Sequence, residues 1–361
     1  MIQTNTQQVS DFIARRKTTC LDLFSEAQAQ GFGDIHFKSD PANQLQAIIA
    51  IHSTRLGPAA GGCRCRHYAT TDDAIEDALR LARGMSYKAA LAGLPSGGGK
   101  AVLILPDELH DREAFFESFG AFVESLGGRY LTAVDSGTSP LDMDIIARRT
   151  RHVLGASRSS GGSGDPSPTT ARGVRMGIEA AVKHLMKRDS LEDIHVAIQG
   201  LGHVGYPLAR ELHAQGARLT VADTHSDHVE RCVDEFNANP VAHETIYSVE
   251  CDVYAPCALG AVINDETIKH FNTRIIAGAA NNQLAHERHG NLLHERGILY
   301  VPDYVINAGG LIHVLLKDQS QREERLLHMI DTLTELLEQS SRSGIPPFKE
   351  ASIMAEEILY S

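Results

Sequence analysis

Apolar positions in the first 150 residues follow strand-like and helix-like patterns in turn. Short apolar runs predict strands at residues 46–52, 101–105 and 129–134. Between the first two runs, residues 72–91 carry apolar side chains at a helical period after an acidic first turn, which predicts a helix. The N-terminal part of the chain is therefore expected to be an α/β domain.

The stretch RSSGGSGDPSPTT, residues 158–170, interrupts this pattern with glycine, serine and proline. Such a composition is typical of a flexible linker, but folded-looking sequence continues on both sides, so we favour a hinge between two domains with a cleft beneath it. A helical period over 171–187 and a strand over 194–199 follow, and then short β-rich runs alternate with helical ones to about residue 310. This alternation predicts a parallel sheet with helices on both faces.

The expected architecture is α/β with two domains, which agrees with a length of 361 residues. The first domain is predicted to span residues 1–155. The amphipathic helical stretch at the end of the chain is expected to return to it, so that residues of about 330–361 join the first domain. Residues 156–329 form the second domain, and a cleft separates the two.

Charge and apolar content narrow the classes of partner. The net charge of −12, from 34 basic and 46 acidic residues, argues against nucleic acid or an anionic membrane as the main partner. The apolar runs fall short of the ~20 residues that a membrane helix needs, and the first 20 residues lack the apolar core of a signal peptide. We expect a cytoplasmic protein.

The six cysteines do not form a disulfide framework. Cys63 and Cys65 are one residue apart, which is the wrong spacing for a zinc knuckle, and no second pair answers them. We expect reduced thiols and no metal site.

The sequence GLPSGGGKAVLIL, residues 93–105, places three glycines before Lys100. A phosphate-binding P-loop would need glycine in place of Leu94, a hydroxyl in place of Ala101 and a helix after the lysine. The segment that follows is instead apolar, short and ended by Pro106, which predicts a strand. We therefore reject the P-loop interpretation.

A second glycine motif, QGLGHVGYPLARELHAQGARLTVAD, matches the dinucleotide fingerprint G-x-G-x-x-G at Gly200, Gly202 and Gly205. A predicted strand precedes it, a helix follows, and a second strand ends in Asp223. The helix N-terminus would face the pyrophosphate, and Asp223 would bind a ribose 2′-hydroxyl and repel a 2′-phosphate. The motif predicts NAD rather than NADP, although a Rossmann-like domain that binds another nucleotide, or none, stays possible. The loop residues between the glycines are Leu201, His203 and Val204.

Two further charged residues stand in unusual places. Lys88 falls on the same side of its predicted helix as Leu81, Met85 and Leu91, so it is either a lysine that extends from an apolar face to solvent or a buried cation that awaits an anion. Asp135 follows a predicted strand and precedes a helix start, where α/β active sites collect, although an ordinary turn aspartate explains it equally well. The helix start is marked by Ser139 as cap and Pro140 in the first turn.

The ordered set of motifs resembles the glutamate, leucine, phenylalanine and valine dehydrogenase family, and within it most closely the leucine-specific members. The resemblance covers roughly residues 45–315 and is very specific. It rests on GPAAGGCR (57–64), RLARGMSYKAALAGLPSGGGKAV (80–102), GRYLTAVDSGTSPLDMD (128–144), GDPSPTTARG (164–173), QGLGHVG, DVYAPCALGA (252–261), AGAANNQL (277–284) and PDYVINAGG (302–310).

That resemblance implies an NAD-dependent oxidative deamination of an L-amino acid to a 2-oxo acid, ammonia and NADH. It implies that Lys88 holds the substrate carboxylate with help from Gly61 and Met85, that Lys100 polarises the attacking water, and that Asp135 accepts and donates the proton. Burial and the charge of Lys88 are expected to lower the pKa of Lys100. Near the nicotinamide and its ribose the resemblance places Thr170, Asn281 and Asn282.

The resemblance also places Ala60, Ala133, Leu311 and Val314 around the substrate side chain. Glutamate enzymes carry a lysine at the position of Ala60, and a buried carboxylate without a partner would cost several kcal/mol, so glutamate is disfavoured. Ala60 also occurs in phenylalanine enzymes, whereas Gly137 matches the leucine type. We favour Leu, Ile or Val over phenylalanine.

Three functional hypotheses remain at this point. They are a branched-chain amino-acid dehydrogenase, the same reaction on an aromatic amino acid, and an NAD-binding sensor without catalysis, which the presence of Lys88, Lys100 and Asp135 disfavours. The family also implies a homo-oligomer, often a dimer or an octamer, with the N-terminal domain binding substrate and mediating assembly.

Overall fold

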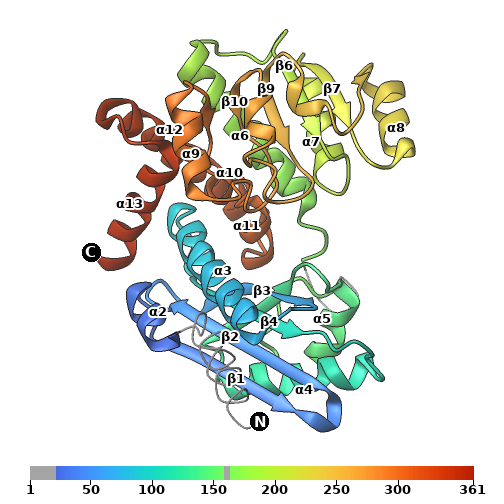
Figure 1. Ribbon diagram of the computed structural model, residues 1–361, viewed down its shortest axis with the longest axis vertical. Helices are drawn as coiled ribbons and strands as arrows, with labels where there is room; N and C mark the ends of the chain where they lie inside the picture. The colour runs from blue at the N-terminus through green and yellow to red at the C-terminus, as the bar shows by residue number, and fades with distance from the viewer. Residues whose placement is uncertain (1–21, 158–162) are drawn as a thin grey trace, which may run out of the picture. The chain divides into compact units, whose positions relative to one another are not determined.

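The computed structural model describes residues 22–157 and 163–361, which divide into two compact units (Figure 1). Unit 1 consists of the chain up to Thr54, Ala59–Arg83 and Gly98–Val153. Unit 2 consists of Arg55–Pro58, Gly84–Gly97 and Leu154–Ser361. Residues 158–162 of the predicted hinge lie outside the described residues.

Unit 1 is built on a five-stranded sheet in the order β1-β2-β4-β3-β5. The strands β1 and β4 run antiparallel to β2, whereas β3 and β5 are parallel to each other. Two of these strands confirm the predictions for residues 46–52 and 129–134. The strands are β1 (Asp34–Asp40), β2 (Leu45–Ser53), β3 (Ala59–Arg66), β4 (Gly97–Ile104) and β5 (Tyr130–Val134).

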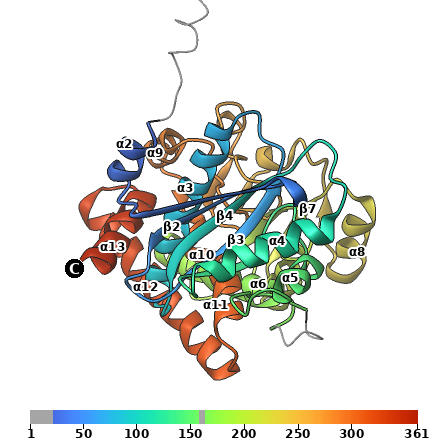
Figure 2. The same cartoon turned by 90° about the horizontal axis from the view of Figure 1, so that it is seen from below.

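Helices cover the sheet of unit 1. Helix α3 (Thr71–Leu91), predicted over 72–91, packs Ala78 and Ala82 into one core with Ile48 and Val102 of the sheet. Figure 2 shows α4 (Arg112–Ser125) on the other side of the sheet from α3, with α5 (Pro140–Ala147) beside it. The short helix α2 (Leu23–Ala29) precedes the first strand. Because both faces are covered, β2 is buried along nearly its whole length.

Strand β4 begins earlier than the apolar pattern predicts. It starts at Gly97 rather than at residue 101, and Gly98, Gly99 and Lys100 already pair with β2. Glycine has low strand propensity, which hides these residues from a sequence pattern. The glycines are therefore part of the sheet and not a loop before it.

Unit 2 contains a six-stranded sheet in the order β11-β10-β9-β6-β7-β8, in which all strands are parallel. Val196 and Ile198 of β6 face one apolar core and Ala197 faces another, so the central strand is buried on both faces. This confirms the predicted parallel sheet. Its strands are β6 (His195–Gln199), β7 (Arg218–Ala222), β8 (Asn239–Pro240), β9 (Cys251–Pro256), β10 (Thr273–Ile276) and β11 (Leu299–Tyr300). Its helices before the C-terminal pair are α6 (Ser167–Met186), α7 (Gly205–Ala214), α8 (Ser226–Phe236), α9 (Glu287–Glu295), α10 (Asp303–Ile306) and α11 (Gly309–Leu315).

The C-terminal helices α12 (Gln319–Ser343) and α13 (Pro347–Tyr360) belong to unit 2. Leu336 and Ala351 share one buried core with Val174 of α6 and Ile198 of β6. The sequence analysis assigned residues of about 330–361 to the first domain instead. An amphipathic pattern shows that a helix has an apolar face but does not identify the surface that this face covers.

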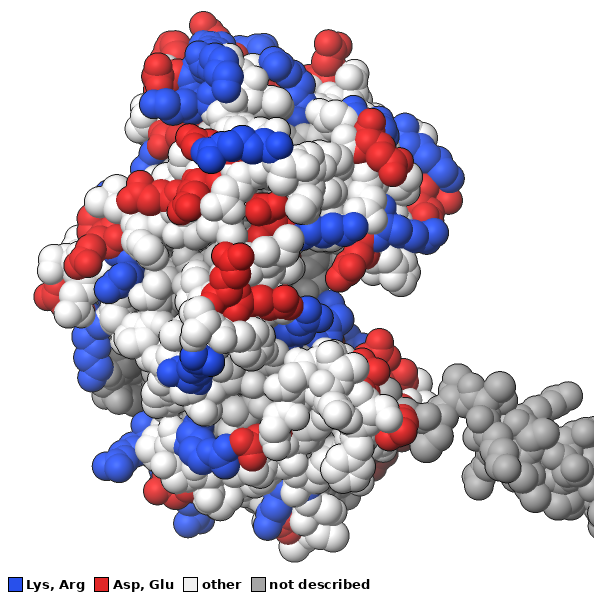
Figure 3. Space-filling model, turned by 90° about the vertical axis from the view of Figure 1, so that its left-hand side faces the viewer, with Lys and Arg blue, Asp and Glu red and all other residues white. Residues whose placement is uncertain are grey.

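On the face drawn in Figure 3, lysine and arginine side chains alternate with aspartate and glutamate. Among the described residues, we find no helix with the length and apolar character needed to cross a membrane.

Candidate active site

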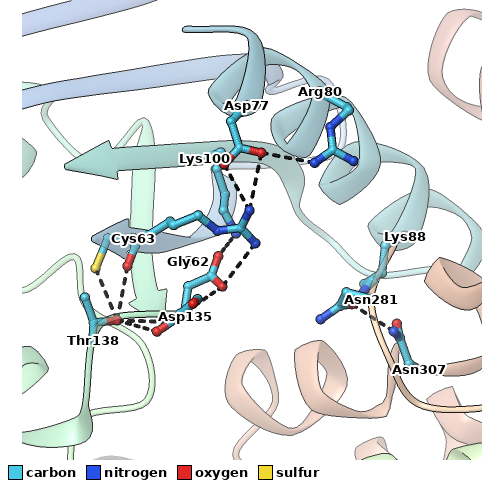
Figure 4. Close-up of polar contacts among 12 residues, drawn as sticks. Gly62, Cys63, Asp77, Arg80, Lys88, Lys100, Asp135, Thr138, Asn281 and Asn307 are labelled. Atoms are coloured by element: carbon cyan, nitrogen blue, oxygen red, sulfur yellow. Dashed lines mark hydrogen bonds and ion pairs between the residues drawn. The ribbon is translucent and has the colours of Figure 1, made fainter. Parts of the chain in front are cut away.

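Lys100 and Asp135 form an ion pair inside unit 1 (Figure 4). Lys100 lies within β4, and Asp135 directly follows the end of β5. Lys100 is only 6% exposed, and 17% of the Asp135 side chain is exposed. Burial lowers the local dielectric constant and strengthens the attraction between the two charges. The structure thus brings together two residues that the sequence analysis selected separately.

The glycines of β3 leave space for this pair. A Cβ atom at Gly61 would lie 1.7 Å from the carbonyl oxygen of Gly99, and one at Gly62 would lie 2.7 Å from the Cβ atom of Asp135. The close contacts seen are between neighbouring strands and with the Asp135 side chain, so a side chain at position 62 would displace the carboxylate.

The turn after Asp135 is held by its own hydrogen bonds. The backbone N–H of Asp135 donates to Oγ1 of Thr138 (2.9 Å), and the N–H of Thr138 donates to the carbonyl oxygen of Asp135 (3.0 Å). Ser139 then caps α5 in a capping box with Asp142, and Pro140 is the first helical residue. The predicted helix start is confirmed, and it fixes the chain on the C-terminal side of Asp135.

Lys88 lies near the C-terminal end of α3, in the part of the helix that belongs to unit 2. Its ammonium group donates to Oδ1 of Asn281 (3.3 Å), an oxygen that also accepts a bond from Nδ2 of Asn307 (2.8 Å; Figure 4). Burial lowers the pKa of Lys88 to about 8, although the Asp303 carboxylate acts in the opposite direction. The direct polar partner of this cation is therefore a neutral amide.

The surroundings of Lys88 agree with the predicted apolar stripe. Leu81 and Leu91 are buried, and Met85 is half-buried. The sequence analysis assigned no role to Asp303 or Asn307, although both lie in the motif PDYVINAGG. Burial raises the pKa of Asp303, and the charge of Lys88 opposes that shift. Polar residues inside an otherwise apolar segment were the signal that could have identified them.

The glycine-rich loop between β6 and α7 has the geometry that its motif predicts. Gly200 adopts a φ of 91° and lies against Ala258, and a Cβ atom at Gly205 would lie 1.9 Å from the carbonyl oxygen of Gly200. A Cβ atom at Gly202 would meet nothing within 4 Å. The loop is therefore tight at its two ends and open at Gly202, which leaves room for a pyrophosphate at the start of α7. His203 and Val204 complete the loop before the helix.

Asp223 directly follows β7 and accepts backbone hydrogen bonds from Leu201 (2.6 Å) and His225 (2.9 Å). Burial raises the pKa of Asp223, but these bonds outweigh it and hold the pKa at about 2. The ring of His228 lies 3.6 Å from the same carboxylate. Asp223, His225 and His228 could together hold a metal ion, yet His225 is the N-cap of α8, and the positive end of a helix disfavours a cation. We assign Asp223 to the nucleotide loop.

Comparison with known proteins identifies the family. Residues 33–152 match the family model described as Glu/Leu/Phe/Val dehydrogenase, dimerisation domain. Residues 161–227 and 221–345 match the model described as Glutamate/Leucine/Phenylalanine/Valine dehydrogenase. The chain belongs to this family.

Individual members of the Glu/Leu/Phe/Val dehydrogenase family are similar over nearly the whole chain. A leucine dehydrogenase of Bacillus subtilis is 49% identical over 341 residues, which cover 93% of this chain and 94% of that protein. A phenylalanine dehydrogenase of Bacillus thermotolerans is 43% identical over 352 residues, or 95% and 92% of the two chains. The crystal structure of an L-tryptophan dehydrogenase from Nostoc punctiforme superposes with a TM-score of 0.82 at 39% identity and covers 93% of this chain and 98% of that one. The resemblance found in the sequence is confirmed.

The residues that the family resemblance places near the nicotinamide and its ribose all lie in unit 2. Thr170 is buried near the start of α6, where its hydroxyl donates to the carbonyl oxygen of Pro166 (3.1 Å). Asn282 has a φ of 52° in the segment after β10. These two positions and Asn281 belong to unit 2, together with the glycine-rich loop.

The four predicted side-chain pocket residues are divided between the units. Ala60 and Ala133 lie on the paired strands β3 and β5 of unit 1, where Ala60 is fully buried and Ala133 is half-buried. Leu311 and Val314 lie on α11 of unit 2. All four side chains are apolar.

The five cysteines in the described residues are free thiols. Burial raises the pKa of each of them, to about 11 in Cys63 and to about 12 in Cys257. These thiols remain protonated and are poor nucleophiles at neutral pH. The others are Cys65, Cys232 and Cys251.

Proposed function

We propose that this protein catalyses the reversible NAD-dependent oxidative deamination of a branched-chain L-amino acid. The products are the 2-oxo acid, ammonia and NADH, and the substrate is Leu, Ile or Val. The observation that carries the proposal is the buried ion pair of Lys100 and Asp135 in a member of this dehydrogenase family. Higher identity to a leucine dehydrogenase than to a phenylalanine dehydrogenase supports an aliphatic substrate.

The residues of the glycine-rich loop suit NAD. Gly202 leaves space for the pyrophosphate, and the ionised Asp223 can accept a hydrogen bond from the ribose 2′-hydroxyl while it repels a 2′-phosphate. We assign Thr170, Asn281 and Asn282 to the nicotinamide end. When bound, NAD accepts the hydride from the α-carbon of the amino acid.

The other steps are assigned to the polar residues of the chain. Lys88, with Gly61 and Met85, binds the substrate carboxylate, because a cation whose direct partner is an amide can accept an anion. After hydride loss leaves an iminium carbon, water adds to it, Lys100 stabilises the developing oxygen charge, and Asp135 takes the proton released. Asp135 then returns this proton to the nitrogen. The C–N bond then breaks and releases ammonia, while the ionised Asp135 accepts the proton of the carbinol oxygen as this oxygen forms the carbonyl.

An aromatic substrate is the second candidate. Ala60 is the observation that favours it, because this small side chain leaves more room than a larger aliphatic residue at the same position. Pockets of this kind often separate substrates that differ by one methylene by only ~1–3 kcal/mol. The identity of the preferred amino acid is therefore a question for a direct assay.

The assay follows NADH formation by the purified protein with NAD and Leu, Ile, Val, Phe, Trp or Glu. We expect the highest kcat/KM with Leu, Ile or Val. A preference for Phe or Trp would replace the branched-chain proposal with the aromatic one. No turnover of any amino acid, with NAD still bound, would support a non-catalytic sensor.

We further propose a cytoplasmic homo-oligomer, a dimer or an octamer, with substrate binding and assembly assigned to unit 1 and NAD binding to unit 2. The description of the family model over residues 33–152 as a dimerisation domain supports the assembly. Mass measurement in solution by light scattering tests it, and a monomer would contradict it.

A further inference from the structure

Arg64 is a second cation beside Asp135. Its Nη2 atom lies 3.6 Å from Oδ1 of Asp135, while Lys100 contacts the other carboxylate oxygen, Oδ2. Side chains two residues apart on a strand point to the same face. Gly62 and Arg64 of β3 therefore face the same way, and the empty space at Gly62 admits the carboxylate that Arg64 contacts. The sequence analysis assigned no role to Arg64.

Asp77 holds the guanidinium group of Arg64 from the opposite side. Nη1 of Arg64 lies 3.0 Å from Oδ2 and 3.3 Å from Oδ1 of Asp77. Asp77 also accepts bonds from the hydroxyl of Tyr68 (2.8 Å) and from Arg80 (3.0 Å). Burial raises the pKa of Asp77, but the charge of Arg64 and the hydrogen bonds lower it by more than burial raises it. The pKa is therefore below its ordinary value, and Asp77 is ionised.

The result is a chain of alternating charges that runs from α3 through β3 to the end of β5. Asp77 on α3 fixes Arg64, Arg64 contacts Asp135, and Asp135 contacts Lys100. Figure 4 labels Asp77, Asp135 and Lys100 of this chain. The side chains of Arg64 and Asp77 are only 15% and 12% exposed. A guanidinium group keeps its charge at all relevant pH values. Its planar shape allows contact with two carboxylates at once.

We propose that Arg64, anchored by Asp77, is a positioning residue that holds Asp135 ionised and keeps its Oδ2 atom directed at Lys100. The inference rests on the proposed function, in which Asp135 exchanges a proton with the substrate. Removal of a neighbouring cation raises the pKa of a carboxyl group. Asp135 also contacts Lys100 on β4, the Ser136 N–H and the Thr138 hydroxyl, and the protonated thiol of Cys63 lies 4.0 Å from that hydroxyl.

The test compares the pH dependence of kcat/KM for the amino acid in wild type, Arg64→Gln, Arg64→Lys and Arg80→Gln. Arg80 is the matched control, because it bonds to Asp77 but is 53% exposed. In Arg64→Gln we expect at least a tenfold loss of kcat. We also expect the acidic limb of the profile to move to higher pH by about one unit. Arg64→Lys should restore part of both, since it keeps the charge, and Arg80→Gln should stay within about twofold of wild type.

Far-UV circular dichroism checks the fold of the whole chain and NADH binding, followed by its fluorescence, checks unit 2, and we expect both to be unchanged in all variants. A profile of Arg64→Gln with its acidic limb in the wild-type position would overturn the proposal, even if kcat fell, because a structural role alone does not move the limb. Equal losses in Arg64→Lys and Arg64→Gln, with NADH binding intact, would also overturn it. An inactive wild-type protein would instead refute the proposed function.

Discussion

The ammonium groups of Lys88 and Lys100 have different electrostatic surroundings, although the two residues are only twelve positions apart in the chain. Lys100 forms a direct ion pair with Asp135, and Arg64 binds the other oxygen of the same carboxylate. Lys88 donates to the neutral amide of Asn281, and burial lowers its pKa to about 8. Lys100 thus has a direct ionic partner, whereas the hydrogen-bond partner of Lys88 is a neutral amide, and the Asp303 carboxylate only partly offsets the effect of burial on its pKa.

Under the proposed function, this difference separates proton chemistry from substrate binding. A lysine paired with a carboxylate can polarise a water molecule while the carboxylate takes its proton. A desolvated lysine beside an amide gains most from an incoming anion, because the ligand replaces the hydration that burial removed. Of the four predictions below, the first three test this division and the fourth tests the nucleotide loop, from the largest expected effect to the smallest.

Replacement of Lys100 by methionine should remove the proton chemistry. Methionine has a similar length but no charge, so we expect kcat to fall by about 10²- to 10⁴-fold. Steady-state kinetics with the best amino acid measure the loss, and NADH fluorescence checks that unit 2 is intact. A variant that kept more than a tenth of wild-type kcat would mean that Lys100 takes no part in catalysis.

The matched change Lys88→Met should act on binding. Loss of one hydrogen-bonded charge pair with the substrate carboxylate corresponds to about 1.5–3 kcal/mol, or roughly a 10- to 150-fold rise in KM for the 2-oxo acid. The reductive direction suits the measurement, because a 2-oxo acid has no amino group whose titration would complicate the result. An unchanged KM would remove Lys88 from the substrate site.

The lowered pKa of Lys88 gives the wild-type enzyme a predicted pH dependence. The amine is a cation below about pH 8 and loses its charge above that value. A 2-oxo acid stays anionic throughout this range, so we expect its KM to rise as the pH increases from about 8. The rise should be absent in Lys88→Met, and a KM that stayed constant to pH 10 in wild type would contradict the assignment.

The change Asp223→Ser tests the cofactor end of unit 2. Loss of an ionised acceptor for the ribose hydroxyl should raise KM for NAD by roughly tenfold and leave kcat nearly unchanged. Loss of the repelling charge should also improve the weak use of NADP. If KM for NAD did not change, the hydrogen bonds from Leu201 and His225 would be the whole function of this carboxylate.

Local patterns were enough to predict most elements of both sheets and the nucleotide loop. Residues 46–52, 72–91 and 194–199 carry apolar periodicities that match β2, α3 and β6 closely. The early start of β4 was missed because glycines carry no apolar pattern. The packing of α12 and α13 was missed because a helix pattern does not name its partner.

The residues of the candidate site also fall into those that the sequence identified and those that it did not. Lys88, Lys100 and Asp135 were selected because each charge stands in an unusual local context. Arg64, Asp77 and Asp303 were not, because an ion pair joins residues far apart in the chain, and a single sequence does not show which charges meet. Arg64 is the last residue of the motif GPAAGGCR, in which the sequence analysis considered only Ala60, Gly61 and Cys63.

The most direct test of the division between the two lysines is the equilibrium affinity of the enzyme–NADH complex for the 2-oxo acid, measured by calorimetry in Lys88→Met and Lys100→Met. This measurement detects binding without turnover. We expect Lys88→Met to bind the 2-oxo acid at least tenfold more weakly than wild type, and Lys100→Met to bind it within about threefold of wild type. Equal losses of affinity in the two variants would contradict the assignment of separate roles.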